Sequence, residues 1–347
     1  MDRAAWRLLG AALAAPLDSL FGEAAPRIHP VRLFGGLMEQ LEELVWHDGV
    51  AAGAAYAAMG VGLGVLVGRV LACLRPGNGR SSLGRLTKRR LQGRELIASA
   101  AAAYISVGAR ALFDSARDVS VALEAGDVDS ARLLVSSLVG RDTDGLGVSE
   151  IARAAVESVA ENTVDAIVAP IMWTCVFGSQ GALGYRAVNT LDAMVGYRNA
   201  RYERFGRASA RMDDAAGWAP ARITAALVML VRPKTAWAVL RCVSRDAPGH
   251  PSPNGGVAEA AFAAALGVQL GGLNRYQGKV EQRCVLGEGP KCELEDIVRS
   301  VELAQDVTRA ATVLAGLAGI VWIAGASVAR TASPKDALSR RNVLENG

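Results

Sequence analysis

The stretch GVAAGAAYAAMGVGLGVLVG, residues Gly49–Gly68, contains no charged side chain. A run of about 20 apolar residues is long enough to cross the hydrocarbon core of a bilayer as a helix. Gly60, Gly64 and Gly68 recur at every fourth position, and small residues at this spacing allow transmembrane helices to approach closely. A glycine-rich nucleotide loop is excluded, because no strand pattern precedes these glycines and no Lys-Ser or Lys-Thr pair follows them. The stretch therefore predicts a transmembrane helix with a closely packed glycine face.

A second uncharged run of the same length, AATVLAGLAGIVWIAGASVA, occupies residues 310–329. Three weaker apolar windows lie at residues 4–21, 167–185 and 223–240. Elsewhere the chain shows apolar residues at three-to-four spacing, which is typical of helices, and no sustained alternation typical of strands. We therefore predict an all-α, polytopic integral membrane protein with sizeable cytoplasmic helical and loop regions. Residues 1–330 are expected to form its single membrane-embedded domain, and the polar residues 331–347 a disordered tail.

The overall composition fits this class of protein. Of the 347 residues, 51% are apolar and 21% are charged, and the net charge is +4. Basic residues gather between Arg69 and Arg94, where no acidic residue occurs. We interpret this block as the cytoplasmic flank of a membrane helix, in preference to a nucleic-acid surface, so residues 69–166 are expected in the cytoplasm. Five cysteines without a Cys-x-x-Cys pair argue against a disulfide framework, and only three histidines argue against a multi-histidine zinc site.

The segment ESVAENTVDAIVAP, residues Glu157–Pro170, holds three carboxylates just before an apolar stretch. On a regular helix Glu157, Glu161 and Asp165 would stack along one face, although like charges at this spacing destabilise a helix by roughly 0.2–0.5 kcal/mol per pair. A solvated helix face is the ordinary explanation. Because unpaired charge is costly beside a membrane, we favour a site in which these acids, with Asn162 beside them, hold Mg²⁺.

Three further segments concentrate polar residues. GRDTDGLG, residues 140–147, holds an arginine beside two acids, and a helix end followed by a capping turn is its simpler interpretation. Residues 189–214 combine acids with arginines, and this combination suits an anionic ligand or anionic lipid headgroups equally well. HPSPNGG, residues 250–256, is a turn before an apolar helix, where backbone N–H groups could bind an anion.

Taken in order, four segments resemble the CobD/CbiB type of integral-membrane cobalamin-biosynthesis protein, the adenosylcobinamide-phosphate synthases. The segments are LDSLFGEAAPRIHPVRLFGGLMEQLE (17–42), VGRDTDGLGVSEIARAAVESVAENTVDAIVAPIMW (139–173), YRAVNTLDAMVGYRNARYERFGRASARMDDAAGWAPARIT (185–224) and SPNGGVAEAAFAAALGVQLGGLNRYQG (252–278). The chain departs from the family pattern at Gly217, where asparagine is usual, and at Gly255, Val257 and Ala258. The resemblance therefore implies no side-chain contact from Gly217 or Gly255.

The resemblance implies an ATP-dependent amide ligation. A carboxylate of adenosylcobyric acid, the corrinoid substrate, is joined to the amine of aminopropanol or aminopropanol O-phosphate to give adenosylcobinamide or its phosphate. ATP and Mg²⁺ are the implied co-substrate and metal ion, and the active site is expected at the cytoplasmic face of a bacterial inner membrane. The protein is expected to contact the lipid bilayer and to bind no nucleic acid. It is also expected to associate with itself or with other cobalamin-assembly enzymes. The alternatives are a corrinoid membrane transporter and a non-catalytic membrane sensor.

The expected site residues come from all of these polar segments. Glu157, Glu161 and Asp165 are expected to hold Mg²⁺ or to include the catalytic base. Arg141, Arg198 and Arg207 are expected to neutralise phosphate charge. The other candidates for binding substrate or nucleotide are Asp142, Asn162, Asn189, Asp192, Asp213, Asp214, Arg222, Ser252, Asn254, Gly256 and Glu259. Neither His29 nor His250 is assigned as a cobalt ligand.

Overall fold

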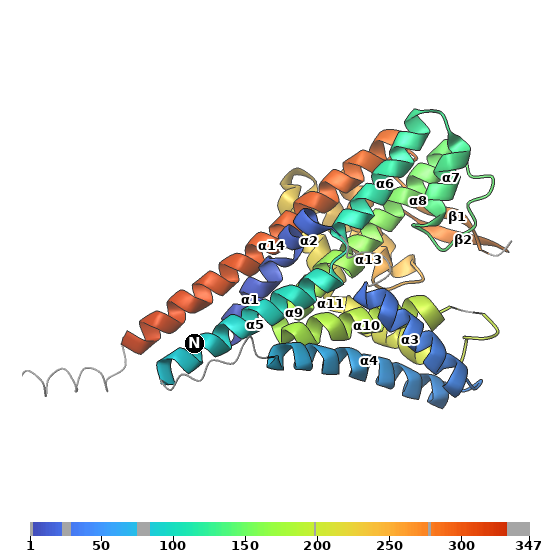
Figure 1. Ribbon diagram of the computed structural model, residues 1–347. Helices are drawn as coiled ribbons and strands as arrows, with labels where there is room; N and C mark the ends of the chain where they lie inside the picture. Colours follow the sequence, from blue (N-terminus) through green and yellow to red (C-terminus); the bar gives the residue numbers. More distant parts are fainter. Residues whose placement is uncertain (1–2, 23–28, 75–83, 198, 277–278, 332–347) are drawn as a thin grey trace, which may run out of the picture.

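The structure is a computed structural model that describes residues 3–22, 29–74, 84–197, 199–276 and 279–331 (Figure 1). The longer helices are α3 (Pro30–Val45), α4 (Val50–Cys73), α5 (Gly84–Ser106), α6 (Ala109–Glu124), α8 (Val148–Thr163), α10 (Ser179–Val195), α11 (Arg207–Val231) and α14 (Leu294–Thr331). The shorter ones are α1 (Arg3–Ala12), α2 (Ala14–Phe21), α7 (Val128–Ser136), α9 (Ala169–Phe177), α12 (Ala236–Asp246) and α13 (Gly255–Leu266), with 3-10 turns at Pro233–Thr235 and Ala247–Gly249. One hairpin, β1 (Leu270–Tyr276) and β2 (Lys279–Leu286), is attached to this helical bundle. Of the predicted tail only Thr331 is described, so a disordered tail at 331–347 stays a prediction.

Four helical segments are long and apolar enough to cross a membrane, and the predicted polytopic all-α membrane fold is thereby confirmed. They are Val50–Cys73, Gly93–Glu124, Arg207–Val231 and Leu294–Ala326. The strong sequence windows at 49–68 and 310–329 correspond to α4 and to the second half of α14. The segment formed by the end of α5 and by α6 was not predicted, because its uncharged part, residues 96–109, is shorter than a full span.

The glycine face of α4 packs against α10, as the glycine spacing predicted. A Cβ atom on Gly64 would lie 2.7 Å from the carbonyl oxygen of Leu183, and one on Gly68 would lie 2.5 Å from the carbonyl oxygen of Ser179. The Ser179 hydroxyl donates a hydrogen bond of 2.8 Å to the Gly68 carbonyl. A Cβ on Gly62, by contrast, would meet nothing within 4 Å. The close approach of the two backbones therefore depends on the glycines of one face.

The weaker sequence windows do not form single helices. Window 4–21 is divided into α1 and α2 at Leu13, and window 167–185 is divided at Gly178. Gly178 has a φ of 65°, a conformation that favours glycine and ends α9. Window 223–240 contains the end of α11, a 3-10 turn and the beginning of α12. None of the three windows matches the limits of a candidate span within the described residues.

A π-helical turn, Val164–Val168, separates α8 from α9. Pro170 has no N–H to donate to the carbonyl of Ala166, four residues earlier. That carbonyl instead accepts a hydrogen bond of 3.0 Å from the backbone N–H of Gly108, at the start of α6. A wider π turn changes the direction of the side chains that follow it. Asp165, which lies in this turn, therefore leaves the helix face on which the two preceding glutamates lie.

The hairpin and α13 bring polar groups to the centre of the bundle. β1 and β2 pair antiparallel, with Leu270 opposite Leu286 and an irregularity between Gly271 and Leu273. The φ value of Gly271 is 78°, so the bulge occurs where the backbone favours glycine. α8 and α13 contribute to the largest hydrophobic core, and nearly every residue of α13 is buried. Acidic residues on these two helices are therefore enclosed by protein.

Candidate functional site

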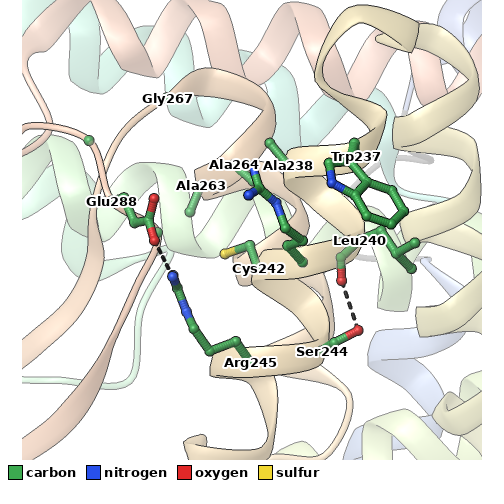
Figure 2. A pocket seen from close by; sticks show the side chains of 13 residues that line it. Trp237, Ala238, Leu240, Cys242, Ser244, Arg245, Ala263, Ala264, Gly267 and Glu288 are labelled. Carbon is green, nitrogen blue, oxygen red and sulfur yellow. Dashed lines mark hydrogen bonds and ion pairs between the residues drawn. The ribbon is translucent and has the colours of Figure 1, made fainter.

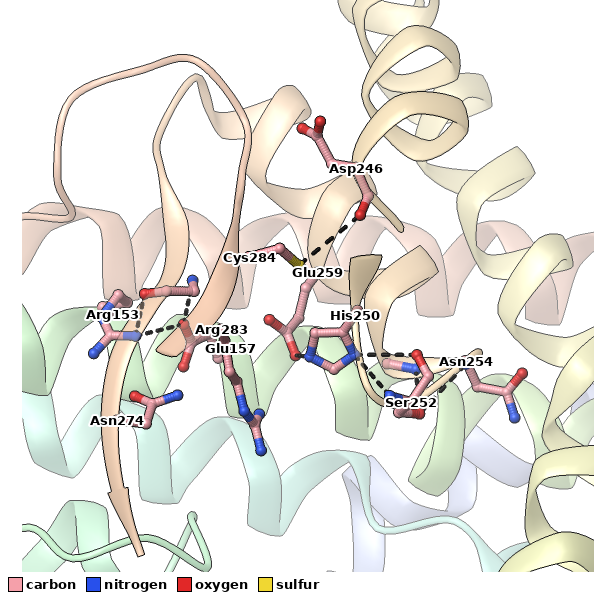
Figure 3. Close-up of polar contacts among 12 residues, drawn as sticks. Arg153, Glu157, Asp246, His250, Ser252, Asn254, Glu259, Asn274, Arg283 and Cys284 are labelled. Atoms are coloured by element: carbon pink, nitrogen blue, oxygen red, sulfur yellow. Dashed lines mark hydrogen bonds and ion pairs between the residues drawn. The ribbon is translucent and has the colours of Figure 1, made fainter. Parts of the chain in front are cut away.

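Glu157 connects α8 to the hairpin. Its Oε2 lies 2.6 Å from Nη1 of Arg141, and its Oε1 accepts hydrogen bonds from Arg153 at 3.1 Å and from the Gly271 N–H at 2.7 Å. Arg141 also donates to Oδ1 of Asn274 in β1 at 2.5 Å. Glu157, Arg153 and Asn274 are drawn in Figure 3. In this arrangement Glu157 and Arg141 form a buried ion pair, and their expected roles toward Mg²⁺ and phosphate stay predictions.

Glu161 meets two acid–base side chains from outside α8. Its carboxylate, the carboxylate of Glu259 and the imidazole of His250 each offer a ligand atom, and these atoms lie within 4.8 Å of one another. Burial raises the pKa of Glu161 to about 8, and repulsion from Glu259 adds to this effect. Burial likewise raises the pKa of Glu259 to about 8. Two carboxyl groups therefore share an enclosed site in which a proton or a metal ion could lie between them.

The acid wall is a second cluster, and it consists of Asp165, Asp192, Asp213 and Asp214. Asn189 of α10 lies between two of these acids, with Nδ2 3.4 Å from Oδ2 of Asp165 and 3.5 Å from Oδ1 of Asp213. The Tyr185 hydroxyl donates to Asp165 at 3.4 Å. The Asp213 carboxylate lies close enough to those of Asp165, Asp192 and Asp214 to be repelled by each of them. A cluster that offers only oxygen atoms suits a hard cation such as Mg²⁺.

The turn before α13 lies between the two clusters. Asn254 donates from Nδ2 to the Asp214 carbonyl at 2.9 Å and accepts from Arg222 at 3.1 Å. The backbone N–H groups of Asn254 and Gly255 donate to the Ser252 hydroxyl at 3.3 and 3.0 Å, and the Gly256 N–H donates to the Ser252 carbonyl at 3.2 Å. These N–H groups are thus satisfied within the turn. The turn does not offer them to an anion in this conformation.

The remaining predicted residues have local or peripheral positions. Asn162 donates to the carbonyl of Ser158, four residues earlier in α8, at 2.9 Å. Asp142 donates its backbone N–H to the Arg275 carbonyl in β1 at 2.9 Å. Arg207 is exposed at the first residue of α11. Arg198 lies outside the described residues, so its expected role stays a prediction.

Sequence reasoning did not assign a role to several side chains that complete the two clusters. His250 was considered only as a cobalt ligand, yet it lies against Glu259, with 3.3 Å between Nε2 and Oε1. Its position within HPSPNGG, next to a predicted turn, was the available signal. Arg153 and Asn274 were missed because the hairpin was missed. The two adjacent glycines of β1 interrupt the alternation that would have indicated a strand.

Two cavities lie apart from these clusters. The larger has a volume of about 610 Å³ and is lined by α12, α13 and the loop after β2 (Figure 2). Trp237 and Leu240 form its apolar wall, and an ion pair between Arg245 and Glu288 closes one side. A second cavity of about 470 Å³ lies between α2, α6 and α14. Neither cavity is lined by a predicted site residue.

Comparison with known proteins agrees with the sequence resemblance. A family model described as CobD/Cbib protein matches residues 11–304. Proteins named "Cobalamin biosynthesis protein CobD" from Mycobacterium tuberculosis, Geobacter metallireducens and Chromobacterium violaceum are 43%, 41% and 41% identical to the chain. The alignments cover 89%, 78% and 83% of this chain and 95%, 84% and 88% of the relatives. No solved structure matches significantly. The extent of the family match and of these alignments shows that the chain belongs to the CobD/CbiB family.

Proposed function

We propose that this protein acts in cobalamin biosynthesis as an ATP-dependent amide ligase. Its substrates are adenosylcobyric acid and aminopropanol or aminopropanol O-phosphate, and its product is adenosylcobinamide or adenosylcobinamide phosphate. Family membership supports the role in cobalamin biosynthesis, because the relatives are named for it. The active site faces the cytoplasm at the inner membrane, where ATP is available. Support for the ligation comes from the arrangement of the polar clusters.

The meeting of three distant segments carries the proposal. Asn189 of α10 contacts Asp165 of the π-helical turn and Asp213 of α11. Asn254 at the start of α13 contacts the next residue of α11, Asp214, and accepts from Arg222, about two helical turns further along. Buried charged residues are costly and often mark functional sites in membrane proteins, so their gathering here favours a ligand-binding site. Residues from several polar segments of the sequence thus lie beside one another.

Amide formation imposes definite requirements on such a site. A carboxylate does not react with an amine until one of its oxygens becomes a leaving group. Transfer of the γ-phosphoryl group of ATP to that oxygen gives an acyl phosphate and ADP. The amine then attacks the acyl carbon, the bond from carbon to the phosphate oxygen breaks, and the products are the amide, inorganic phosphate and a proton. The site must therefore stabilise phosphate charge and accept a proton.

The acid wall and Arg222 meet these requirements. Asp165, Asp192 and Asp213 would supply the carboxylate oxygens that Mg²⁺ prefers, and an ion held there would neutralise phosphate charge. The Arg222 guanidinium stacks 4.7 Å from the centre of the Trp218 ring, which holds it ready to bind a phosphate oxygen. A carboxylate of the acid wall accepts the proton that the ammonium form of the amine must lose before attack.

A ligation assay on purified, detergent-solubilised protein tests the proposal. The reaction contains adenosylcobyric acid, aminopropanol phosphate and Mg-ATP, and mass spectrometry detects adenosylcobinamide phosphate. We expect product only when ATP is present, and we expect Asp213→Asn to lower the rate by about 100-fold, as losses of one electrostatic contact to a transition state do. Exposed Glu203→Gln is the matched control and should keep the wild-type rate.

The alternatives give different results in the same assay. A transporter or a sensor makes no amide and consumes no ATP in response to corrinoid. Absence of product from folded protein, when a relative from the same family makes product under the same conditions, contradicts the ligase proposal. Equal rates for Asp213→Asn and the wild type would contradict the assignment of the acid wall while leaving the reaction intact.

A further inference from the structure

Three side chains from separate segments, the half-buried Glu161 and the buried His250 and Glu259, converge on one point. Glu161 belongs to α8, Glu259 belongs to α13, and His250 lies in the loop before α13. Their ligand atoms lie within 4.8 Å of one another, and the side chains of His250 and Glu259 are 1% and 3% exposed. Figure 3 shows the imidazole directed toward Glu259. This cluster is distinct from the acid wall and contains a nitrogen donor.

The imidazole of His250 is fixed in position and has an unused nitrogen. Its Nδ1 lies 3.1 Å from both the carbonyl oxygen and the backbone nitrogen of Ser252. When the proton is on Nδ1, it donates to this carbonyl, and the lone pair of Nε2 is directed into the cluster. Histidines that bind metals commonly donate their other ring N–H to a backbone carbonyl. Nε2 is buried, lies 3.3 Å from Oε1 of Glu259 and makes no hydrogen bond within the described residues, so it is placed to share a ligand with that carboxylate.

The negative charge of the cluster is incompletely balanced. Glu157, one helical turn before Glu161, forms ion pairs with Arg141 and Arg153. Arg141 and Arg283 attract Glu259, whose side chain is only 3% exposed. A cation between the two carboxylates would relieve the cost of burying both charges.

The backbone leaves room beside these ligand atoms. A Cβ atom on Gly255 would lie 2.8 Å from Oε1 of Glu161 and 3.4 Å from Cε1 of His250. Two ligand atoms bound to one zinc ion at 2.0–2.2 Å are roughly 3.4 Å apart, so the cluster needs about an ångström of side-chain movement to close on a metal ion. Rotation of flexible glutamate side chains can supply this movement. The glycine keeps the space for it open.

We propose that Glu161, His250 and Glu259 bind one divalent transition-metal ion such as Zn²⁺, in preference to Mg²⁺. Imidazole nitrogen together with carboxylate oxygens suits zinc and its neighbours, whereas Mg²⁺ prefers oxygen ligands and retains water. The ion joins α8 to the loop and helix that contain the other two ligands. Its site is separate from the acid wall and does not depend on the proposed ligation.

Metal binding by the purified protein tests this proposal without any substrate. Tag-free full-length protein in detergent is treated with a chelator, dialysed against micromolar Zn²⁺ and analysed by mass spectrometry for bound metal. We expect one zinc per chain, retained in the presence of millimolar Mg²⁺. His250→Ala should weaken zinc binding by at least the roughly 10–100-fold that loss of an outer-shell partner costs, because it removes a ligand itself. Exposed His47→Ala is the matched control and should bind zinc as the wild type does.

Gly255→Ala provides a second variant that preserves all three ligands. Alanine suits the first turn of a helix, so α13 should form, while the new methyl group crowds Oε1 of Glu161 and weakens zinc binding. This variant decides the outcome if His250→Ala does not elute as a folded protein in size-exclusion chromatography. The proposal is overturned if the wild type binds no zinc, if Mg²⁺ displaces zinc at comparable concentration, or if the folded variants bind zinc unchanged. An inactive protein that still binds zinc would contradict only the ligase proposal.

Discussion

Glu157→Gln should destabilise the protein and release the hairpin from α8. The substitution preserves the shape of the side chain and an oxygen that can accept from the Gly271 N–H. It removes the charge that the guanidinium groups of Arg141 and Arg153 contact at 2.6 and 3.1 Å. Both arginines would remain in place with their counter-charge lost. The effect should therefore be structural and not catalytic.

The burial of the Glu157, Arg141 and Arg153 side chains sets the size of the expected loss of stability. The side chains of Arg141, Arg153 and Glu157 are 4%, 12% and 8% exposed. Removing one partner of a buried ion pair costs about 3–5 kcal/mol, because the other charge stays buried without compensation. With an unfolding entropy of ~2.1 cal/mol/K per residue, this loss lowers the melting temperature of a chain of this length by about 4–7 °C. Replacing both partners, as in Arg141→Met with Glu157→Gln, should cost less than the sum of the single changes.

Two measurements follow the unfolding and the hairpin separately. A maleimide dye reports thermal unfolding through Cys242 and Cys292, which are buried in the native state. Hydrogen exchange reports the opening of β1, where the Gly271 amide should lose protection first. Exposed Glu302→Gln in α14 is the matched control. An unchanged melting temperature and unchanged exchange in Glu157→Gln would refute the structural role of Glu157.

Other predictions concern packing, capping and acid stability. Gly68→Ala should destabilise the protein by about 1–3 kcal/mol through overpacking, whereas Gly62→Ala should be near neutral in the same thermal assay. Asp18→Ala removes a carboxylate that caps the first turn of α6 at 2.7 Å, so exchange in that turn should accelerate, with a stability loss of about 1 kcal/mol. Hydrogen bonding to Arg245 lowers the pKa of Asp246 from 3.8 to about 2. Asp246 therefore contributes stability above pH 4 that is lost as the pH falls toward 2, and Asp246→Asn should reduce this acid dependence of the melting temperature.

The carboxylate segment shows how far the sequence could predict the site. A spacing of i, i+4 and i+8 implies a single acidic face only if the helix is regular throughout. Pro170 prevents this, because the lost N–H allows the π-helical turn that redirects Asp165. Glu157, Glu161 and Asp165 therefore contribute to three different environments. Their partners come from segments about 100 residues away or from other helices, and local spacing carries no information about such contacts.

Helical features that depend on local physics were predictable. The length and charge-free character of residues 49–68 predicted α4, and the glycine spacing predicted a closely packed face, which in the structure lies against α10. Spans that contain charged residues were harder to find, since the charges of α5 and α6 are accommodated by protein contacts such as the pair of Arg7 and Glu95. The hairpin was missed because Gly271 and its neighbour adopt positive φ values and interrupt the strand pattern.

An oxygen-transfer experiment tests most directly the central claim that the protein activates a carboxylate with ATP. Adenosylcobyric acid labelled with ¹⁸O in its free carboxylate is incubated with the protein, aminopropanol phosphate and Mg-ATP. The acyl phosphate route moves one carboxylate oxygen to phosphorus, so the released inorganic phosphate should carry one ¹⁸O for every amide formed. Amide that forms while the phosphate stays unlabelled, or phosphate that is released without amide, would contradict the account.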